Sequence, residues 1–164
     1  PGGFTAGHVR ALMAVPDWPL TVPLICYEAI FPQDVVVTSE SRSGVLLNVT
    51  NDAWFGLTPG PYQHFAQARL RAIEQGLPMV RAANNGISAI IDPYGRIMTK
   101  LDLGEAGIID GDLPVPLAER TIFSRLQPYS DEIFLIFMGL ILTLFTLRKL
   151  IPRRVKPDGA TSDR

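Results

Sequence analysis

The sequence predicts an α/β domain followed by one apolar helix, and three observations carry this prediction. Two short apolar runs, Val22–Cys26 and Gly44–Val49, have the length and composition of buried strands. A stretch with helical periodicity, Tyr62–Gln75, separates them from further strand-like runs. Residues 133–147 are fifteen residues without a charge, eleven of them Leu, Ile or Phe. Strands that alternate with a helix are typical of the α/β class, and the uncharged run is a separate element.

The chain before the helix is expected to contain two strands joined by a short helical segment. Residues 1–20 are rich in Gly and Pro and predict no regular element. Val22–Cys26 is an apolar run that ends at a polar pair, as a buried strand does. Gln33–Glu40 has room for one or two helical turns, and Gly44–Val49 leads into a loop with the sequence TNDAWFGLTPGP.

The predicted helix Tyr62–Gln75 has clear start and stop signals. Pro61 suits the first helical position, Gly76 suits the C-terminal cap, and Pro78 prevents continuation. The spacing of the apolar residues predicts a buried face made of Phe65, Ala66, Leu70, Ile73 and Leu77. The opposite face is expected to present Gln67, Arg71 and Glu74 to solvent.

The region after this helix predicts a hairpin and two more strands. MVRAAN and ISAIID flank Asn85-Gly86, a pair that accepts the positive φ angles of a primed two-residue turn. Asp92-Pro93-Tyr94-Gly95 is a second turn and leads to the strand RIMTK. Ala106–Leu113 is expected to be the last strand, and residues 114–130 have the composition of a linker.

The uncharged run has two interpretations. As a buried core helix its fifteen residues give about 22 Å, at ~1.5 Å per residue, against a hydrocarbon layer of ~30 Å. As a membrane span it can extend to Ile151, about 28 Å, since Arg148 and Lys149 can direct their charges to the interface. Insertion scales credit eleven large apolar residues with roughly 3–7 kcal/mol, which favours the span. Basic residues without an acidic one follow the run, as in a cytoplasmic flank: Arg148, Lys149, Arg153, Arg154 and Lys156.

The domain prediction follows from these elements. Residues 1–125 form the α/β domain, 126–132 a linker, 133–151 a transmembrane helix and 152–164 a basic cytoplasmic tail. Because the tail is expected in the cytoplasm, the α/β domain is expected on the other side of the membrane.

Charge and cysteine content exclude some classes of function. Residues 1–147 carry 9 basic and 14 acidic side chains, a net −5, while residues 148–164 carry 6 and 2, a net +4. An acidic body is a poor candidate for nucleic-acid binding, which needs a basic surface. One cysteine excludes an internal disulfide, and no Cys/His cluster has zinc spacing, so we expect neither a metal nor a cofactor. His8 and His64 are interpreted as ordinary polar residues.

Cys26, the one cysteine, is followed directly by Tyr27 and Glu28. A lone cysteine in an apolar run is usually a small buried hydrophobe. Glu28 favours another interpretation, because an unpaired carboxylate in a dry site is costly, and strand ends in α/β folds collect ligand-facing residues. Cys26 is therefore a candidate nucleophile. Its activators are not identified by sequence, since the nearest cations, Arg10 and Arg42, are sixteen residues away on either side.

Five segments carry a resemblance to a known family: ICYEAIFP, LLNVTNDAWFG, GPYQHFAQARLRAIEQG, RAANNGISAIIDPYGRI and the apolar run with its basic tail. In this order they resemble bacterial apolipoprotein N-acyltransferase, a membrane-embedded member of the nitrilase, or carbon–nitrogen hydrolase, superfamily. Cys-Tyr-Glu alone is a weak signal. Combined with Asn-Asp-Ala-Trp-Phe-Gly and Asn-Asn-Gly it is specific, and the resemblance extends from residue 1 to about residue 151.

The resemblance implies the C-terminal part of a nitrilase-like αββα sandwich followed by one transmembrane helix. It places the protein in the bacterial inner membrane with its catalytic domain in the periplasm. Cys26 would take an acyl chain from a phospholipid as a thioester and pass it to the N-terminal amine of a diacylglyceryl-cysteine apolipoprotein. The backbone N–H of Tyr27 would face the oxyanion, and Glu28 would be a supporting carboxylate. Trp54 and Phe55 either line the lipid entrance or only pack within their loop. Arg81, Asn84 and Asn85 either face the site or only build the hairpin.

The resemblance also implies catalytic groups that this chain does not match. In the family a glutamate and a lysine upstream of the cysteine complete the triad, whereas the first lysine here, Lys100, lies far beyond Cys26. We therefore expect the chain alone to hold the nucleophile and to be inactive. Two alternatives stay open: a soluble nitrilase-type amidase that hydrolyses a small amide, and a membrane-anchored binding domain without catalysis.

Overall fold

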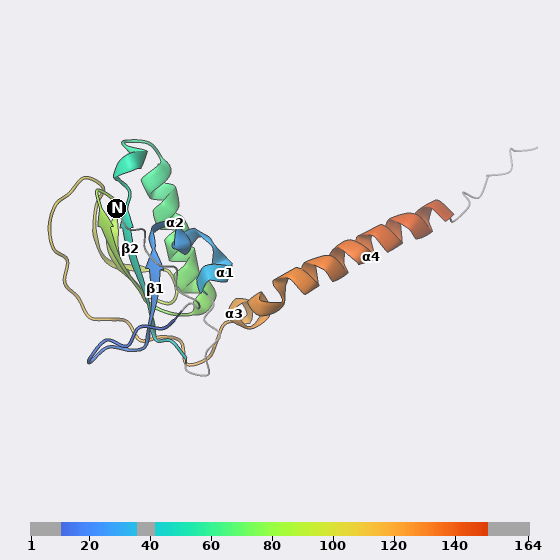
Figure 1. Ribbon diagram of the computed structural model, residues 1–164, viewed down its shortest axis with the longest axis horizontal. Coiled ribbons are helices and arrows are strands. Elements are labelled where there is room, and N and C mark those ends of the chain that lie inside the picture. Colours follow the sequence, from blue (N-terminus) through green and yellow to red (C-terminus); the bar gives the residue numbers. More distant parts are fainter. Residues whose placement is uncertain (1–10, 36–41, 151–164) are drawn as a thin grey trace, which may run out of the picture. The chain divides into compact units, whose positions relative to one another are not determined.

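The computed structural model describes residues 11–35 and 42–150 and divides the chain into two units, Pro1–Pro128 and Tyr129–Arg164. The first unit contains a five-stranded sheet in the order β1-β2-β3-β4-β5 (Figure 1). Its strands are β1 Thr21–Ile25, β2 Val45–Asn51, β3 Met79–Asn84, β4 Ser88–Ile91 and β5 Ile97–Leu101. The first three strands are parallel, whereas β4 runs antiparallel to both β3 and β5. The predicted α/β class is confirmed.

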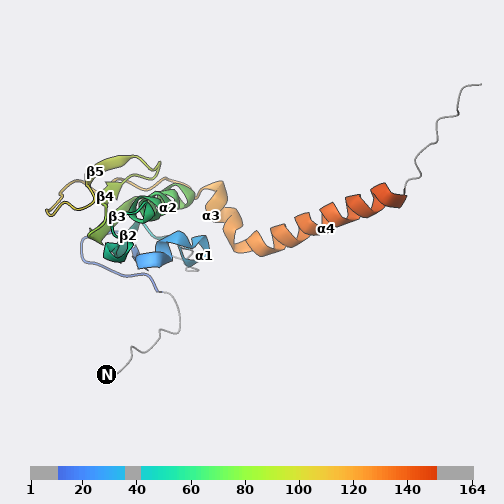
Figure 2. The same ribbon diagram turned by 90° about the horizontal axis from the view of Figure 1, so that it is seen from above.

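The helices of the first unit are η1 Cys26–Ile30, α1 Pro32–Val35, η2 Ala53–Phe55, α2 Gly60–Gln75, α3 Ile122–Leu126 and η3 Gln127–Tyr129, the last of which ends at the boundary between the units. Parallel neighbours need a crossover connection, and α2 supplies it between β2 and β3. It lies along one face of the sheet (Figures 1 and 2). Gly76 ends it in the left-handed conformation, with φ +65°, and its N–H bonds the carbonyl oxygens of Ala72 and Ile73. The predicted stop signal is confirmed.

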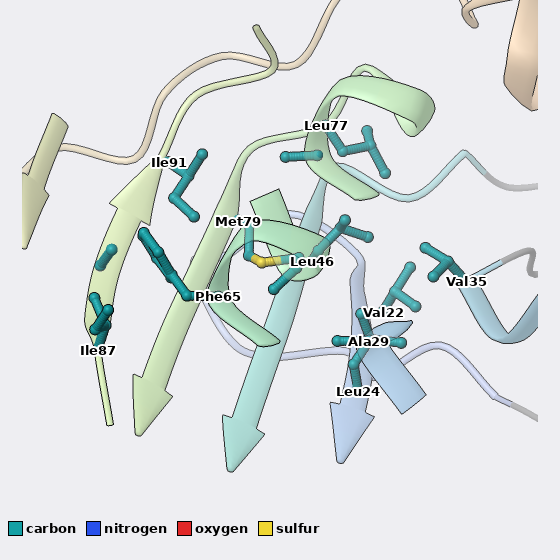
Figure 3. Close-up of a cluster of buried hydrophobic side chains, with 13 residues drawn as sticks. Val22, Leu24, Ala29, Val35, Leu46, Phe65, Leu77, Met79, Ile87 and Ile91 are labelled. Atoms are coloured by element: carbon teal, nitrogen blue, oxygen red, sulfur yellow. The ribbon is translucent and has the colours of Figure 1, made fainter. Parts of the chain in front are cut away.

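The hydrophobic core lies between α2 and the sheet, as Figure 3 shows. It consists of Val22, Leu24, Ala29, Val35, Leu46, Phe65, Ala68, Ala72, Leu77, Met79, Ile87, Ala89 and Ile91. Burying one large apolar side chain contributes about 1.5–3 kcal/mol, so this layer dominates the stability of the unit. The opposite face of the sheet is less covered, because Ile25 and Val49 remain 57% and 41% exposed.

The predicted buried face of α2 is wrong for Ala66, Leu70 and Ile73, which are all exposed. Leu70 and Ile73 are more than 40% exposed, whereas Ala68, Ala72 and Arg71 are buried. Small residues face the sheet because they let the helix approach closely. Arg71 tolerates burial because it pairs with the Glu74 carboxylate at 2.8 Å. Leu77 and Phe65 are buried as expected.

The hairpin between β3 and β4 is confirmed, but its turn differs from the predicted primed form. Of the central pair only Asn85 has a positive φ, +51°. Gly86 is needed for a different reason, since a Cβ there would lie 2.6 Å from Oδ2 of Asp52 and 2.9 Å from the Cβ of Ala83. The glycine therefore makes room for a carboxylate.

The second predicted turn, residues 92–95, is also confirmed. Oδ1 of Asp92 accepts the N–H groups of Tyr94 at 2.9 Å and Arg96 at 2.8 Å, and Gly95 adopts a φ of +77°. Burial alone would raise the pKa of Asp92. The hydrogen bonds from Arg96 and Tyr94 outweigh burial and lower this pKa.

The strand predicted at Ala106–Leu113 is wrong, because this segment has no regular structure. It has no ladder partner among the residues that the structure describes, and Ile108 is 96% exposed. Two glycines and two aspartates in eight residues give it poor strand propensity. The predicted linker 114–130 is not fully irregular either, since it contains α3, capped by the Thr121 side chain.

The second unit contains one long helix, α4, Ser130–Leu150. It begins three residues before the uncharged run and has 21 residues, about 31 Å at ~1.5 Å per residue. By length and composition one helix of the described chain can cross a membrane, Ile122–Arg148, with a mean hydropathy of 1.8 and none of its apolar window buried. The basic residues Arg153, Arg154 and Lys156, His8 and the second half of the helical segment predicted at Gln33–Glu40 lie outside the described residues.

Candidate active site

The carboxyl ends of β1, β2 and β3 meet at one edge of the sheet because these strands are parallel (Figure 1). Cys26 follows β1 directly, Asp52 follows β2, and Asn84 ends β3. The N–H of Asp52 donates to the carbonyl oxygen of Asn84 at 3.0 Å. In α/β folds this edge collects ligand-facing residues, and here it carries the one cysteine of the chain.

The backbone of Cys26 turns sharply. Its φ of +51° lies in the left-handed region, which costs a residue other than glycine roughly 1–2 kcal/mol. The residue is partly exposed. Oε2 of Glu28 accepts the N–H of Ile25 at 2.7 Å and closes the turn around it. Strain of this kind persists only where the surroundings hold it, and it is concentrated at functional sites.

The carbonyl oxygen of Cys26 faces two buried side chains. Nε2 of His64, on α2, lies 3.2 Å from it, a hydrogen bond that requires a hydrogen on Nε2. Nδ2 of Asn48, on β2, donates to it at 3.4 Å and to the carbonyl oxygen of Leu24 at 2.9 Å. Hydrogen bonds therefore connect the strained Cys26 to both β2 and α2.

Beneath this carbonyl lies a buried polar network centred on Asp52. Its Oδ1 lies 2.8 Å from Nδ1 of His64, and its Oδ2 accepts from Arg81 at 2.8 Å. Arg81 also donates to the side-chain oxygen of Asn48 and to the carbonyl oxygen of Ile87. Removing one partner from a buried ion pair typically costs about 3–5 kcal/mol, so these contacts strongly constrain one another.

Burial opposes the charges of both Asp52 and Arg81. It would raise the pKa of Asp52, but the hydrogen bond with His64 and the charge of Arg81 outweigh it and lower this pKa. Burial lowers the pKa of Arg81, and the Asp52 carboxylate and the Cys26 thiolate offset part of that effect. Asp52 is therefore ionised at neutral pH. Arg81 carries the positive charge of this network beside Asp52, although it lies 55 residues beyond Cys26 in the sequence.

Aromatic rings cover the network. The ring of Tyr27 stacks on that of His64, with centroids 5.3 Å apart and planes at 26°. Phe55 meets Tyr27 edge-on at 6.0 Å, and Trp54 lies 6.3 Å from Tyr27. Trp54 is nonetheless 74% exposed. The cluster thus shields the polar groups on one side and offers a large apolar surface on the other.

A pocket of about 630 Å³ lies beside Cys26. It is lined mostly by apolar surface, from Ile25, Cys26, Val49, Thr50, Asn51, Ala53 and Trp54. Pockets of this size and character bind largely apolar ligands with a few polar contacts. In the described ranges 11–35 and 42–150, no group of three or more His, Cys, Asp or Glu side chains could hold a metal ion.

The sequence profile described as carbon–nitrogen hydrolase matches residues 5–123 of the chain. The chain belongs to the carbon–nitrogen hydrolase family. Cys26 and the strand β1 before it lie within the part of the chain that the carbon–nitrogen hydrolase profile matches. The predicted membership of this superfamily is confirmed.

Two curated relatives of this carbon–nitrogen hydrolase chain are both named apolipoprotein N-acyltransferase. The Rhodopseudomonas palustris protein is 50% identical over 151 residues, which cover 92% of this chain and 27% of the relative. The Brucella melitensis biotype 1 protein is 59% identical over 116 residues, which cover 71% and 22%. The chain therefore spans about a quarter of the length of the curated relatives it matches.

Two solved structures share the fold. A carbon–nitrogen hydrolase from Helicobacter pylori G27 superimposes with a TM-score of 0.50 at 14% identity, covering 60% of this chain and 42% of that one. Saccharomyces cerevisiae Nit3, a member of branch 10 of the nitrilase superfamily, also gives 0.50, at 18% identity, covering 62% and 40%. The predicted nitrilase-like fold is confirmed.

The site residues predicted from the sequence have different surroundings, and their roles stay predictions. Cys26 and Trp54 line the pocket. Tyr27 packs over His64, and Glu28 binds the backbone before the cysteine. Phe55 is not among the lining residues, and its ring contacts those of Tyr27 and Trp54.

Sequence reasoning missed most of the polar network. The sequence alone indicates for His64 no role beyond that of an ordinary polar residue. It contains Asn48 and Asp52 only as parts of a motif, and it leaves open whether Arg81 faces the site or only builds the hairpin. A signal was present on the helix, because His64, Ala68, Arg71 and Gln75 recur at helical spacing and share its buried face. Asn84 and Asn85 belong to the hairpin, and Asn84 contributes a backbone bond to the site.

Proposed function

We propose that this chain is the nucleophile-bearing part of an apolipoprotein N-acyltransferase of the bacterial inner membrane. The observation that carries the proposal is the position of Cys26, a strained, partly exposed residue in the wall of a mostly apolar pocket. The similarity to relatives named apolipoprotein N-acyltransferase supports the reaction class. An apolar pocket beside the thiol suits a fatty acyl chain.

The reaction proceeds in two steps. In the first, the Cys26 thiolate attacks the ester carbonyl of a phospholipid; the C–S bond forms, the ester C–O bond breaks, and the lysophospholipid leaves with a proton. In the second, the α-amine of a diacylglyceryl-cysteine apolipoprotein attacks the thioester. The C–N bond forms, the C–S bond breaks, and the amine loses a proton as the thiolate is regenerated. A covalent intermediate divides one difficult exchange into two easier steps.

Each neighbouring residue has a proposed role. The backbone N–H of Tyr27 stabilises the oxyanion, a contribution of about 3–4 kcal/mol for a well-placed donor. Glu28 supports the site by holding the turn at Ile25. Trp54 lines the route of the acyl chain, and Phe55 supports Trp54 from behind. The glutamate and lysine that complete the triad are supplied by a part of the full-length protein outside this chain, which spans about a quarter of its curated relatives.

The proposal also includes an orientation in the membrane. α4 is the transmembrane helix, the unit Pro1–Pro128 lies in the periplasm, and residues 152–164 lie in the cytoplasm. The length of α4, its exposed apolar side chains and the basic residues that follow it support this arrangement.

The test uses the full-length protein in detergent with phosphatidylethanolamine as the acyl donor. Mass spectrometry of the peptide containing Cys26 should show an added fatty-acyl mass that hydroxylamine removes. Addition of a diacylglyceryl-cysteine peptide should discharge the thioester and yield the N-acylated peptide. If Cys26→Ser acylates the peptide at the normal rate, the mechanism is wrong; if the protein instead hydrolyses small amides and forms no acyl peptide, the amidase alternative is correct.

A further inference from the structure

We propose that His64 is a positioning residue for acyl transfer: held by Asp52, it fixes the orientation of the peptide group between Cys26 and Tyr27. The inference rests on the proposed function, because it concerns an acyl transfer at Cys26. It adds a role for a buried side chain that does not touch the reacting atoms.

The carbonyl oxygen of Cys26 is held mainly by His64. It accepts a hydrogen bond from Nε2 of His64 at 3.2 Å. Nδ2 of Asn48 is farther from it, at 3.4 Å, and donates its shorter hydrogen bond, 2.9 Å, to the carbonyl oxygen of Leu24. His64 is itself fixed, because Nδ1 lies 2.8 Å from Oδ1 of Asp52. The ring of Tyr27 stacks on the imidazole and restricts its tilt. The carbonyl is therefore attached to a side chain that cannot easily turn away.

The geometry of a trans peptide links the Cys26 carbonyl to the N–H of Tyr27. The C=O of one residue and the N–H of the next point in opposite directions across the peptide plane. With the Cys26 carbonyl directed at His64 in the buried network, the N–H of Tyr27 points away from the network. This N–H is the donor assigned above to the oxyanion. A donor that is already oriented costs no reorganisation when charge develops on the substrate.

The backbone of Cys26 is strained. A φ of +51° is unfavourable for cysteine and persists only while neighbouring contacts hold the turn. Without a partner for the Cys26 carbonyl, the peptide group between Cys26 and Tyr27 is free to turn about ψ of Cys26 and φ of Tyr27. Rotation of that peptide moves the Tyr27 N–H away from the oxyanion but leaves the thiol in place. Loss of His64 should therefore impair attack on an acyl group far more than the intrinsic reactivity of the thiol.

A pair of substitutions separates this role from simple packing. In His64→Gln the amide nitrogen reaches about as far as Nε2, so the bond to the Cys26 carbonyl can persist. In His64→Asn the amide reaches only about as far as Nδ1, so the contact with Asp52 can persist while the carbonyl loses its partner. In the full-length protein with phosphatidylethanolamine, His64→Asn should slow single-turnover thioester formation by about 100-fold, typical of a lost oxyanion donor. His64→Gln should keep at least about a tenth of the wild-type rate.

Alkylation of Cys26 by iodoacetamide is the second readout, because displacement at carbon forms no oxyanion. Its rate should stay within about threefold of wild type in both variants, since it depends on thiolate content and access. Gln75→Leu is the matched control: Gln75 is a buried polar residue of the same helix that bonds Gln127 and has no contact with Cys26. This variant should change the melting temperature without changing thioester formation.

The outcomes distinguish the two proposals. If the wild-type protein forms no thioester, the proposed function fails and the positioning role fails with it. If the wild type reacts and folded His64→Asn reacts as fast as His64→Gln, only the positioning role is wrong. Equal loss of acylation and alkylation in His64→Asn also overturns it, because that result indicates general damage to the site. Should His64→Asn not fold, Asp52→Asn takes its place with the same pair of rate measurements, and unchanged acylation in it overturns the role.

Discussion

Gly86 and Asp52 are so close that a single methyl group cannot be added between them. A Cβ on Gly86 would lie 2.6 Å from Oδ2 and 3.0 Å from Cβ of Asp52. The carboxylate has little freedom to move, since the Arg81 guanidinium binds one oxygen and the His64 imidazole faces the other. The turn of the β3–β4 hairpin therefore limits the position of the group that holds His64.

Gly86→Ala should destabilise the first unit by about 1–3 kcal/mol, the usual cost of overpacking, and should slow thioester formation at Cys26 because Asp52 is displaced. Thermal unfolding and single-turnover acylation of the full-length protein measure the two effects. Gly107→Ala is the control, since the nearest atom to a Cβ there is 3.5 Å away, an ordinary contact. Equal behaviour of the two variants would show that the close approach at Gly86 is not restrictive.

Asp52→Asn should remove a pH-dependent part of the stability. The pKa of Asp52 is lowered from its ordinary value of 3.8, so its contribution is complete above that value and is lost as the pH falls through the folded pKa. The stability difference between wild type and Asp52→Asn should thus be largest near neutral pH and shrink in acid. Unfolding temperatures across the acid range measure this.

Asp92→Asn provides the comparison for that experiment. The pKa of Asp92 is lowered as well, so this variant should show the same sign of pH dependence. Asp92 caps a turn that is away from Cys26, so its substitution should leave the rate of thioester formation unchanged. If the stability difference for Asp52→Asn grows as the pH falls, the ionised network is not stabilising.

Trp54→Ala should weaken binding of long-chain acyl donors. The indole lines the pocket and presents most of its surface to solvent, so its loss removes apolar contact with an acyl chain. We expect KM for phosphatidylethanolamine to rise about tenfold, as burial of part of one large apolar side chain is worth ~1–2 kcal/mol. Leu57→Ala is the control, because Leu57 is 98% exposed and lies outside the lining. An unchanged KM in Trp54→Ala would exclude a role in binding the chain.

α4 should behave as an integral membrane segment. A fusion of residues 125–164 should stay in the membrane pellet after a carbonate wash. Leu140→Arg places a charge near the middle of the helix, which costs roughly 3 kcal/mol or more, and should reduce insertion. Leu140→Ile keeps the apolar surface and should insert normally. Release of the unsubstituted fusion into the supernatant would instead indicate a helix that packs in a soluble core.

The 164-residue chain expressed alone should have no acyltransferase activity. The glutamate and lysine that activate the cysteine in the family are not matched in this chain, and a thiol without a base to deprotonate it is a weak nucleophile. The chain should also be poorly soluble, since Ile25 and Val49 on the open face of the sheet remain exposed. Turnover by the chain alone that is lost in Cys26→Ala would show that a residue within it acts as the base.

The elements with local signals were predictable from sequence. The Asp92 turn, the Gly76 cap and the strand before Cys26 each depend on residues within a few positions, and all three are present. The strand predicted at Ala106–Leu113 is wrong because the prediction gave more weight to its apolar residues than to its two glycines and two aspartates, which disfavour strands.

The residues of the candidate site can be predicted from the sequence only where they belong to a recognisable motif. Cys26 was found because cysteine is rare in the chain and a family resemblance surrounds it. The bonds from His64 and Asn48 to its carbonyl join residues 38 and 22 positions apart, and no periodicity encodes such a contact. Leu70 is exposed because the small residues Ala68 and Ala72 pack against the sheet instead, so the size of an apolar side chain on a helix does not by itself predict its burial.

The change from parallel to antiparallel pairing at β3 has a consequence for the order of folding. The β3–β4–β5 meander is closed by short turns, whereas Val22 pairs with Leu46, and Leu46 with Met79, across 24 and 33 residues. Pairings across long loops form later because more chain entropy must be lost first. The strained Cys26 needs β1, β2 and α2 together, so in the nascent chain it should be a relaxed, ordinary thiol. Pulsed alkylation during refolding should therefore find its acquisition of native reactivity among the last events.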